Sequence, residues 1–338
     1  MIEIDGSFGE GGGQIIRTSL GLSALTNQPC KIFNIRKGRP NPGLRPQHLT
    51  AVNALAEICD AGLSGACLRS EELVFNPGKI TGGEFSWDVQ TAGSVTLVLQ
   101  ALLPAAACSR KSFVFNIRGG TNVPWSPSFE HLKRVFCYYL SGMGAKIKVD
   151  LLSHGFYPQG GGFVKLTLSP SELRPLNLDN RGDFEKIDIW SIASSDLRHA
   201  NVAERQVKGF KNCFADLKIG KIHEVYVESA CSGSSIHAHA HFTNCKLGAQ
   251  ALGAPKKSAE NVGTECAKNL IAELQSSSTA DSHTFDQLLP YIAIVGGSLR
   301  FREMTSHAKT NIWVIEKFLP VKFVVKGGMI SVDRLNHC

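Results

Sequence analysis

Hydrophobic residues along the chain alternate between the spacing of short strands and that of helices. Ile2–Asp5 is predicted to form a strand, and the apolar residues from Ile15 to Leu25 recur at the spacing of one helix face. The alternation continues with strands expected near residues 30–35, 73, 85 and 113–117, and with helices expected near residues 47–59 and 94–103. This order of elements is typical of an α+β or α/β fold.

One uncharged apolar segment, Thr91–Cys108, is long enough to suggest a membrane span. Polar residues open it, and Gln100 and Pro104 interrupt it. Because proline removes a hydrogen bond from a helix, we expect a buried helix that ends near Pro104 and no association with a membrane.

Two loop-like stretches divide the chain. Pro175, Asn177, Asn180 and Gly182 precede a new series of strands and helices, and the polar stretch 276–282 follows a helix-like segment at 260–274. We therefore predict a small inserted domain at residues 183–277 within a larger domain of residues 1–182 and 278–338. Three consecutive glycines at 11–13 and again at 160–162 suggest an internal repeat, although repeated turn chemistry would give the same match.

Composition places the chain among intracellular globular proteins. Its 36 Lys and Arg against 29 Asp and Glu give a net charge of +7, which favours polyanionic partners without identifying one. No secretory leader or C-x-x-C pair is recognised, so we expect reduced thiols and a cytoplasmic location, or a nuclear one in a eukaryote. The ten cysteines are Cys30, Cys59, Cys67, Cys108, Cys137, Cys213, Cys231, Cys245, Cys266 and Cys338.

Two segments are candidates for binding phosphate, although the common nucleotide-binding signatures are missing. The glycine-rich loop Gly6–Gly13 precedes a helix, where backbone N–H groups bind anions, but a plain tight turn explains it equally well. The loop Ile35–Arg45 carries four cations stiffened by two prolines, and we favour phosphate binding there over a merely solvated charge run. Arg17 follows the glycines and could join this group.

Two sets of histidines are candidates for chemistry. His307 is expected in a loop with small neighbours, where a neutral imidazole with a pKa of about 6.5 is a competent nucleophile. A structural or capping role explains the same pattern. His237, His239 and His241 alternate, so their side chains share one face of a strand. We favour a polar, exposed strand face there over a metal site, because no carboxylate or cysteine stands at a supporting spacing.

Several separate motifs follow one another along the chain. They are Gly9–Arg17, Arg36–Arg39 with Pro42–Leu49, Ala92–Gln100, His154–Gly162, and His307 with Thr310–Ile312 and Phe318–Val321. Together and in this order, they closely resemble the RNA 3′-terminal phosphate cyclase family. The resemblance extends from end to end and is weakest over residues 183–277.

The resemblance implies a fold and a reaction. The α+β fold would contain a large domain of three repeated units, each with two helices and a four-stranded sheet, similar to enolpyruvyl transferases, and a small inserted α/β domain. The reaction would be ATP-dependent cyclisation of an RNA 3′-terminal phosphate, in which AMP passes from a histidine to the RNA. RNA 3′-phosphate ends would be the partner, and a homodimer is one arrangement that the sequence allows.

The resemblance also implies roles for single residues. His307 would be the adenylated nucleophile, and Glu10 would bind a divalent metal, Mg²⁺ or Mn²⁺. The ATP-binding residues would be Gln100, Pro127, His283, Thr284, Phe285, Asp286 and Gln287, and the residues around the reacting phosphates would be Gln14, Arg17, Arg36, Arg39 and Asp286. Related sequences can carry an aromatic ring in place of His283, which puts adenine stacking there in doubt.

Two other functions fit parts of the pattern. A non-catalytic relative that binds RNA during ribosome assembly would lack the histidine that is present here as His307. A small-molecule enolpyruvyl transferase would need no adenylated histidine. The features that separate these alternatives are His307 together with Gln100 and Asp286.

Overall fold

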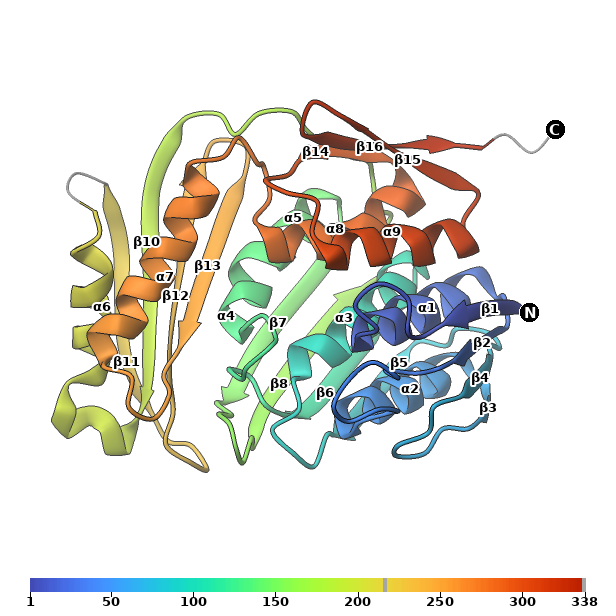
Figure 1. Ribbon diagram of the computed structural model, residues 1–338, viewed down its shortest axis with the longest axis horizontal. Helices are drawn as coiled ribbons and strands as arrows, with labels where there is room; N and C mark the ends of the chain where they lie inside the picture. Colours follow the sequence, from blue (N-terminus) through green and yellow to red (C-terminus); the bar gives the residue numbers. More distant parts are fainter. Residues whose placement is uncertain (215–217, 336–338) are drawn as a thin grey trace.

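The computed structural model describes residues 1–214 and 218–335, and this part of the chain forms four small sheets with helices packed between and against them (Figure 1). The fold is therefore α+β, as predicted. Cys338 lies outside the described residues. In spatial order, the first sheet contains β1 (Ile2–Asp5), β2 (Cys30–Phe33), β4 (Leu73–Asn76) and β3 (Gly62–Ser64), and the second contains β5 (Gly83–Asp88), β6 (Phe113–Gly119), β8 (Gly162–Ser169) and β7 (Lys146–Ser153). The third sheet contains β9 (Leu176–Leu178), β14 (Gly297–Arg300), β16 (Met329–Arg334) and β15 (Val321–Lys326). The fourth sheet contains β11 (Ile219–Val227), β10 (Phe184–Ser194), β12 (Ser234–Phe242) and β13 (Lys246–Leu252).

Three of the sheets have the same connectivity. In each, the first two strands along the chain are parallel, and the fourth strand lies antiparallel between the second and the third. The fourth sheet, β11-β10-β12-β13, has a different order and is inserted in the chain between β9 and β14. An insertion at a loop of this kind leaves β9 and β14 free to pair with each other.

Five of the long helices, α1, α2, α3, α8 and α9, contribute apolar faces to the main core. α1 packs against α2, α3 and α9, and α8 packs against α9. A second, separate core lies between the β10–β13 sheet and helices α6 and α7, on the left of Figure 1. The helices are α1 (Gly13–Thr26), α2 (Pro46–Cys59), α3 (Val95–Cys108), α4 (Phe129–His131), α5 (Cys137–Gly142), α6 (Val202–Lys211), α7 (Ala259–Leu274), α8 (Ser282–Val295) and α9 (Ser306–Phe318). A π-helical segment, Leu132–Phe136, joins α4 to α5.

The structure corrects three local predictions. α3 does not end near Pro104 but continues to Cys108. The residues around Pro104 are almost fully buried, so packing stabilises the helix although the proline removes one hydrogen bond. His307 lies in the first turn of α9 rather than in a loop, because the Thr305 hydroxyl accepts a hydrogen bond from the Ala308 N–H at 2.9 Å and caps the helix. The strand expected near residues 30–35 is the shorter β2, which ends at Phe33.

The two glycine triplets occupy different places in the fold. Gly11–Gly13 link β1 to α1 after the first strand of one sheet, whereas Gly160–Gly162 precede β8 in another sheet. Their match therefore reflects turn chemistry and not equivalent positions in a duplicated unit.

The expected exposure of the three alternating histidines is wrong. His237 and His239 are each only 2% exposed, because this face of β12 lies against α4 and its continuation. The ring of His131 on α4 lies 6.0 Å from the ring of His237. Across residues 1–214 and 218–335, no helix is both long and apolar enough to cross a membrane.

Candidate functional site

The first turns of α1 and α9 meet at the glycine-rich loop, and this meeting point contains His307. Gln14, in the first turn of α1, holds His307 with both ends of its amide. Its Nε2 donates to the His307 carbonyl oxygen at 2.6 Å, and its Oε1 accepts from Nδ1 of the imidazole. Because Nδ1 then carries the proton, the lone pair of a neutral His307 lies on Nε2. A neutral His307 thus has the tautomer whose Nε2 lone pair can attack once this atom is released from the Glu10 carboxylate.

Nε2 of His307 faces a carboxylate. Glu10 Oε2 lies 3.0 Å from Nε2 and 3.5 Å from Arg39 Nη2. The His307 side chain is 49% exposed, so a ligand in solvent can reach it. Partial burial lowers the pKa of His307, Arg17 and Arg39 lower that pKa further, and Glu10 raises it. Engagement of Glu10 by a cation would remove the group that favours the imidazolium and would leave a neutral nucleophile.

Arg17 is a cation without a protein partner for its buried nitrogen. Its Nε is buried and makes no hydrogen bond to the described residues, and burial lowers the pKa of Arg17 to about 10. A buried guanidinium nitrogen needs an acceptor, and phosphate oxygens match its geometry. The site beside His307 therefore offers this guanidinium N–H as a hydrogen-bond donor to an anion.

The glycine-rich loop fits closely around a buried histidine. A Cβ on Gly13 would lie 2.2 Å from His48 Nε2, and a Cβ on Gly9 would lie 2.5 Å from Thr310 Oγ1. Gly9 and Gly11 also have φ values of +59° and +55°, which glycine adopts without strain. These contacts and φ values explain why Gly9, Gly11 and Gly13 carry no side chain.

The basic loop contributes its arginines unequally. Arg39 reaches the carboxylate of Glu10. Arg36 instead donates from Nη1 to the carbonyl oxygens of Asn41 and Gly43 at 2.5 and 3.0 Å, and so stabilises its own loop. The guanidinium of Arg36 still lies close enough to Arg39 and Arg45 for their charges to lower its pKa, after burial, which is the main cause.

The face of α8 toward α9 carries Asp286, which the structure brings to the His307 site. Asp286 Oδ1 accepts from the Thr305 hydroxyl at 3.2 Å, two residues before His307. Burial raises the pKa of Asp286 to about 7, and the charge of Glu10 contributes. Gln287 lies on the next position of α8, and its Oε1 is buried without a hydrogen-bond partner among the described residues. Both residues offer polar atoms that a ligand could satisfy.

Other residues of this α8 segment have contacts within the protein. Thr284 is fully buried, and its hydroxyl donates to Asp281 Oδ2 at 2.9 Å. The Phe285 ring stacks on Phe301 with centroids 4.9 Å apart and is also buried. His283 is exposed, and its ring lies 5.7 Å from the ring of His131. The His283 side chain is thus exposed, Asp286 is partly buried against Thr305, and Phe285 lies in the core.

Gln100 and Pro127 lie on neighbouring elements. The Pro127 carbonyl oxygen accepts from the Thr96 hydroxyl at 2.7 Å, and Gln100 follows Thr96 by one turn on α3. Residues four apart share one face of a helix, so Gln100 lies on the same face of α3 as Thr96, which contacts Pro127.

Two residues of the inserted sheet, Gln250 and Gly248, form hydrogen bonds to this region at two places. The sequence did not indicate either residue. Gln250 on β13 accepts from the Ser128 N–H at 2.6 Å and donates to the Ser126 carbonyl at 2.8 Å, on either side of Pro127. Gly248, two residues earlier, donates its N–H to Asp281 Oδ2 at 3.0 Å. Asp281 is the N-cap of α8. Because these partners are more than 30 residues apart, no local pattern could reveal them.

Known proteins are similar to this chain over nearly its whole length. A family model described as RNA 3′-terminal phosphate cyclase matches residues 8–325. The chain is 44% identical over 335 residues to the RNA 3′-terminal phosphate cyclase of Pyrococcus furiosus, covering 97% of this chain and 96% of the relative. It is 44% identical over 331 residues to the protein of that name from Thermococcus kodakarensis (96% and 95% covered) and 42% identical over 340 residues to that from Methanopyrus kandleri (97% and 96% covered). The chain belongs to the RNA 3′-terminal phosphate cyclase family.

Proposed function

We propose that this enzyme converts an RNA 3′-terminal phosphate into a 2′,3′-cyclic phosphodiester and consumes ATP by way of a histidine-bound AMP. The observation that carries the proposal is the environment of His307. Gln14 fixes the proton on Nδ1, Nε2 faces the solvent-accessible site, and the unpartnered guanidinium nitrogen of Arg17 is close by.

The reaction divides into three transfers. His307 Nε2 attacks the α-phosphorus of ATP, the N–P bond forms and pyrophosphate leaves. An oxygen of the RNA 3′-phosphate then attacks the same phosphorus, and the N–P bond breaks. Finally the neighbouring 2′-OH, already positioned on the same ribose, attacks the activated 3′-phosphorus and releases AMP. The 2′-OH requirement makes RNA ends the substrate for cyclisation.

The residues around His307 would bind the phosphates. Arg17 and Arg39 approach His307 closely enough to affect its pKa, and they would offset negative charge on the phosphoryl oxygens. Gln14 would orient the imidazole while Arg36 keeps the basic loop in shape.

The ATP base and ribose would lie between α3 and α8. Gln100 and Pro127 would form one side, and His283, Asp286 and Gln287 the other. Thr284 and Phe285 would contribute by packing α8, since their side chains contact other parts of the protein.

A divalent metal, Mg²⁺ or Mn²⁺, fits the carboxylates of the site. Glu10 is partly exposed, and its charge helps to raise the pKa of Asp286, so a divalent cation would relieve the repulsion between them. Glu10 would hold the ion, which would supply charge stabilisation at the phosphates when bound.

The architecture suggests how the molecule is organised. The shared connectivity of three sheets supports three repeated units that make up a large domain of residues 1–182 and 278–338. The separate core of residues 187–270 supports an inserted domain at 183–277. We place the protein in the cytoplasm, with its thiols reduced.

The first test uses ATP labelled on the α-phosphate, with Mg²⁺ and no RNA. We expect acid-labile label on the denatured wild-type chain and none on His307→Ala. His199→Ala is the matched control. It removes an exposed histidine that is distant from His307 in the sequence, and it should be labelled like the wild type. An unlabelled wild-type chain that nevertheless binds ATP would refute the histidine-AMP mechanism and favour a non-catalytic RNA-binding role.

A further inference from the structure

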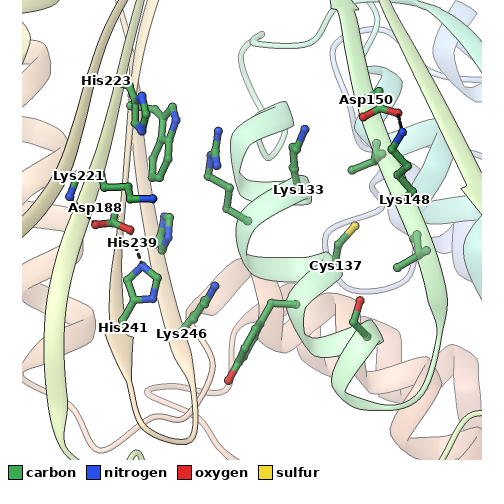
Figure 2. A pocket seen from close by; sticks show the side chains of 16 residues that line it. Lys133, Cys137, Lys148, Asp150, Asp188, Lys221, His223, His239, His241 and Lys246 are labelled. Carbon is green, nitrogen blue, oxygen red and sulfur yellow. Dashed lines mark hydrogen bonds and ion pairs between the residues drawn. The ribbon is translucent and has the colours of Figure 1, made fainter.

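A cleft of about 820 Å³ separates the inserted sheet from the π-helical segment Leu132–Phe136, α5 and β7. Figure 2 shows side chains from both walls pointing into it, with Asp188, His239 and His241 on the sheet side and Lys133 on the helix side. The proposed cyclase reaction uses none of these residues.

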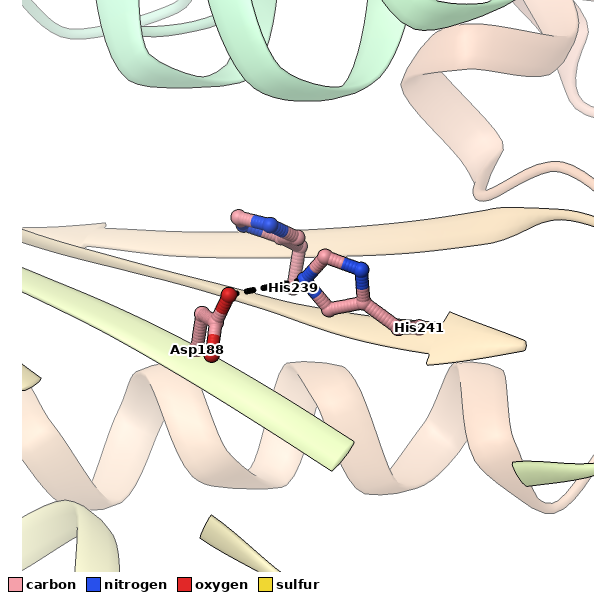
Figure 3. A group of neighbouring side chains, drawn as sticks. All are labelled: Asp188, His239 and His241. Atoms are coloured by element: carbon pink, nitrogen blue, oxygen red, sulfur yellow. Dashed lines mark hydrogen bonds and ion pairs between the residues drawn. The ribbon is translucent and has the colours of Figure 1, made fainter. Parts of the chain in front are cut away.

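Strand pairing assembles a carboxylate and two imidazoles on this sheet face. His239 and His241 alternate on β12, and Asp188 on β10 is the direct cross-strand partner of His239. One potential ligand atom from each residue lies within 4.8 Å of the others (Figure 3). Two imidazoles and a carboxylate are a ligand set that zinc accepts at sites with an open coordination position.

We propose that Asp188, His239 and His241 bind a zinc-type divalent transition metal, with its open position facing the cleft. This inference goes beyond the proposed cyclase function and does not depend on it. It also differs from the Mg²⁺ or Mn²⁺ ion proposed near Glu10, because imidazole nitrogens favour zinc, copper, nickel or iron over magnesium.

The surroundings of the three residues restrict their geometry. Asp188 Oδ1 accepts the Lys221 backbone N–H at 2.7 Å, which fixes the carboxylate. The His239 ring stacks on Trp190 at 5.1 Å and 9°. His239 is 2% exposed, and its Nδ1 is buried and has no hydrogen-bond partner among the described residues. Metal ligands are commonly oriented by such outer contacts.

Binding requires one local rearrangement. His241 Nε2 now lies 2.9 Å from Asp188 Oδ2, so in the neutral ring the proton between them is on Nε2. For Nε2 to bind the metal, that proton must move to Nδ1, after which the metal replaces it between the two residues. The hydrogen bond therefore already brings the two ligand atoms to a shared point.

The nearby cations affect what else would bind. Lys186 Nζ lies 3.3 Å from Asp188 Oδ2, and Lys246 and Arg134 also line the cleft. Their charges oppose a bare cation, so the fourth ligand should be anionic, such as hydroxide or a phosphate oxygen.

The experiment measures zinc and cobalt binding to the full-length protein after removal of metals with a chelator. Zinc is titrated in competition with a chromophoric chelator, and Co²⁺ is followed by its d–d absorption. We expect one equivalent of zinc per wild-type chain, and affinity at least about a hundredfold weaker in His239→Gln and in His241→Gln, since even outer-contact changes cost about 10- to 100-fold. His223→Gln, which alters a histidine of the same cleft outside the cluster, should bind like the wild type.

Three results would overturn the proposal. They are wild-type zinc uptake well below one equivalent, unchanged affinity in both glutamine variants, and a sulfur-to-cobalt charge-transfer band that assigns the ion to cysteines. Asp188→Asn adds a third variant that preserves shape. Circular dichroism checks that each variant is folded, so lost zinc binding can be separated from lost structure.

Discussion

Replacing Gln14 with Met tests whether its amide orients the nucleophile. The side chain keeps a similar length but loses both hydrogen bonds to His307, the donation to the carbonyl oxygen at 2.6 Å and the acceptance from Nδ1. At about 0.5–1.5 kcal/mol for each bond, the orientation is worth about 1–3 kcal/mol. If both bonds stabilise the transition state, their loss slows histidine labelling by about 5- to 150-fold, because about 1.4 kcal/mol of activation free energy changes a rate tenfold.

The assay is single-turnover labelling of His307 with α-labelled ATP over a range of ATP concentrations. An orienting role lowers the maximal rate constant, whereas a pure phosphate contact raises the ATP concentration needed for half-maximal rate and leaves the maximum unchanged. The two roles of Gln14 are therefore distinguished in one data set.

Gln28 supplies a matched control at the other end of the same helix. Its Nε2 donates to the carbonyl oxygen of Phe318, the last residue of α9, at 3.1 Å. Gln28→Met should reduce stability to a similar degree and leave the maximal labelling rate within about twofold of the wild type. A maximal rate for Gln14→Met within twofold of the wild type would refute the orienting role of Gln14. Equal slowing in both variants would show that a shift of the helix, and not the loss of the two bonds to His307, slows labelling.

Three further changes probe the framework of the site. Gly13→Ala places a Cβ 2.2 Å from His48 Nε2 and should cost about 1–3 kcal/mol of unfolding free energy in urea, whereas Gly12→Ala, whose Cβ meets only an arginine terminus at 3.3 Å, should cost much less. Burial lowers the pKa of His48 to about 3, so the unfolded chain gains a proton below pH 6.5 that the folded chain does not. Stability should thus fall with acidity by up to about 1.4 kcal/mol per pH unit for this residue, and His48→Asn should flatten the measured slope between pH 6 and 4 by about that amount. Tyr139→Phe removes a buried hydroxyl that lies 2.6 Å from the carbonyl oxygens of Lys246 and Thr279, and denaturation should show a loss of about 1–3 kcal/mol, with a loss under about 0.5 kcal/mol contradicting this account.

The parts of the site that the sequence predicts are those in which a short motif determines its own geometry. The glycines need positive φ at Gly9 and Gly11, and a helix must start where their loop ends, so a strand–loop–helix order is visible locally. The sequence singled out His307 by its small neighbours. Its place inside α9 was missed, because the Thr305 cap that begins the helix one residue earlier was not recognised.

The parts that it does not predict depend on strand pairing between distant segments. The three alternating histidines were judged to lack a supporting carboxylate, yet the antiparallel register of β10 and β12 sets Asp188 opposite His239 across about fifty residues of chain. The exposure of that face was also misjudged, since alternation identifies which residues share a face but not what covers it. Packing against α4, which belongs to another sheet's unit, decided the burial.

The inserted sheet supports the candidate ATP site from its far side. Asp281 accepts five hydrogen bonds, from His131, from the backbone and hydroxyl of Thr284, from the His283 N–H and from the Gly248 N–H. It thereby joins the first turn of α8 to both α4 and β13, and Gln250 on β13 holds the backbone on either side of Pro127. Removing one partner of a buried charge such as Asp281 typically costs about 3–5 kcal/mol. Because β13 is bonded to both edges of the region where ATP is proposed to lie, displacement of the sheet would move α8 and the Pro127 loop apart. The inserted sheet is therefore part of the framework of the site, and the face that carries Gln250 also carries Asp188, His239 and His241.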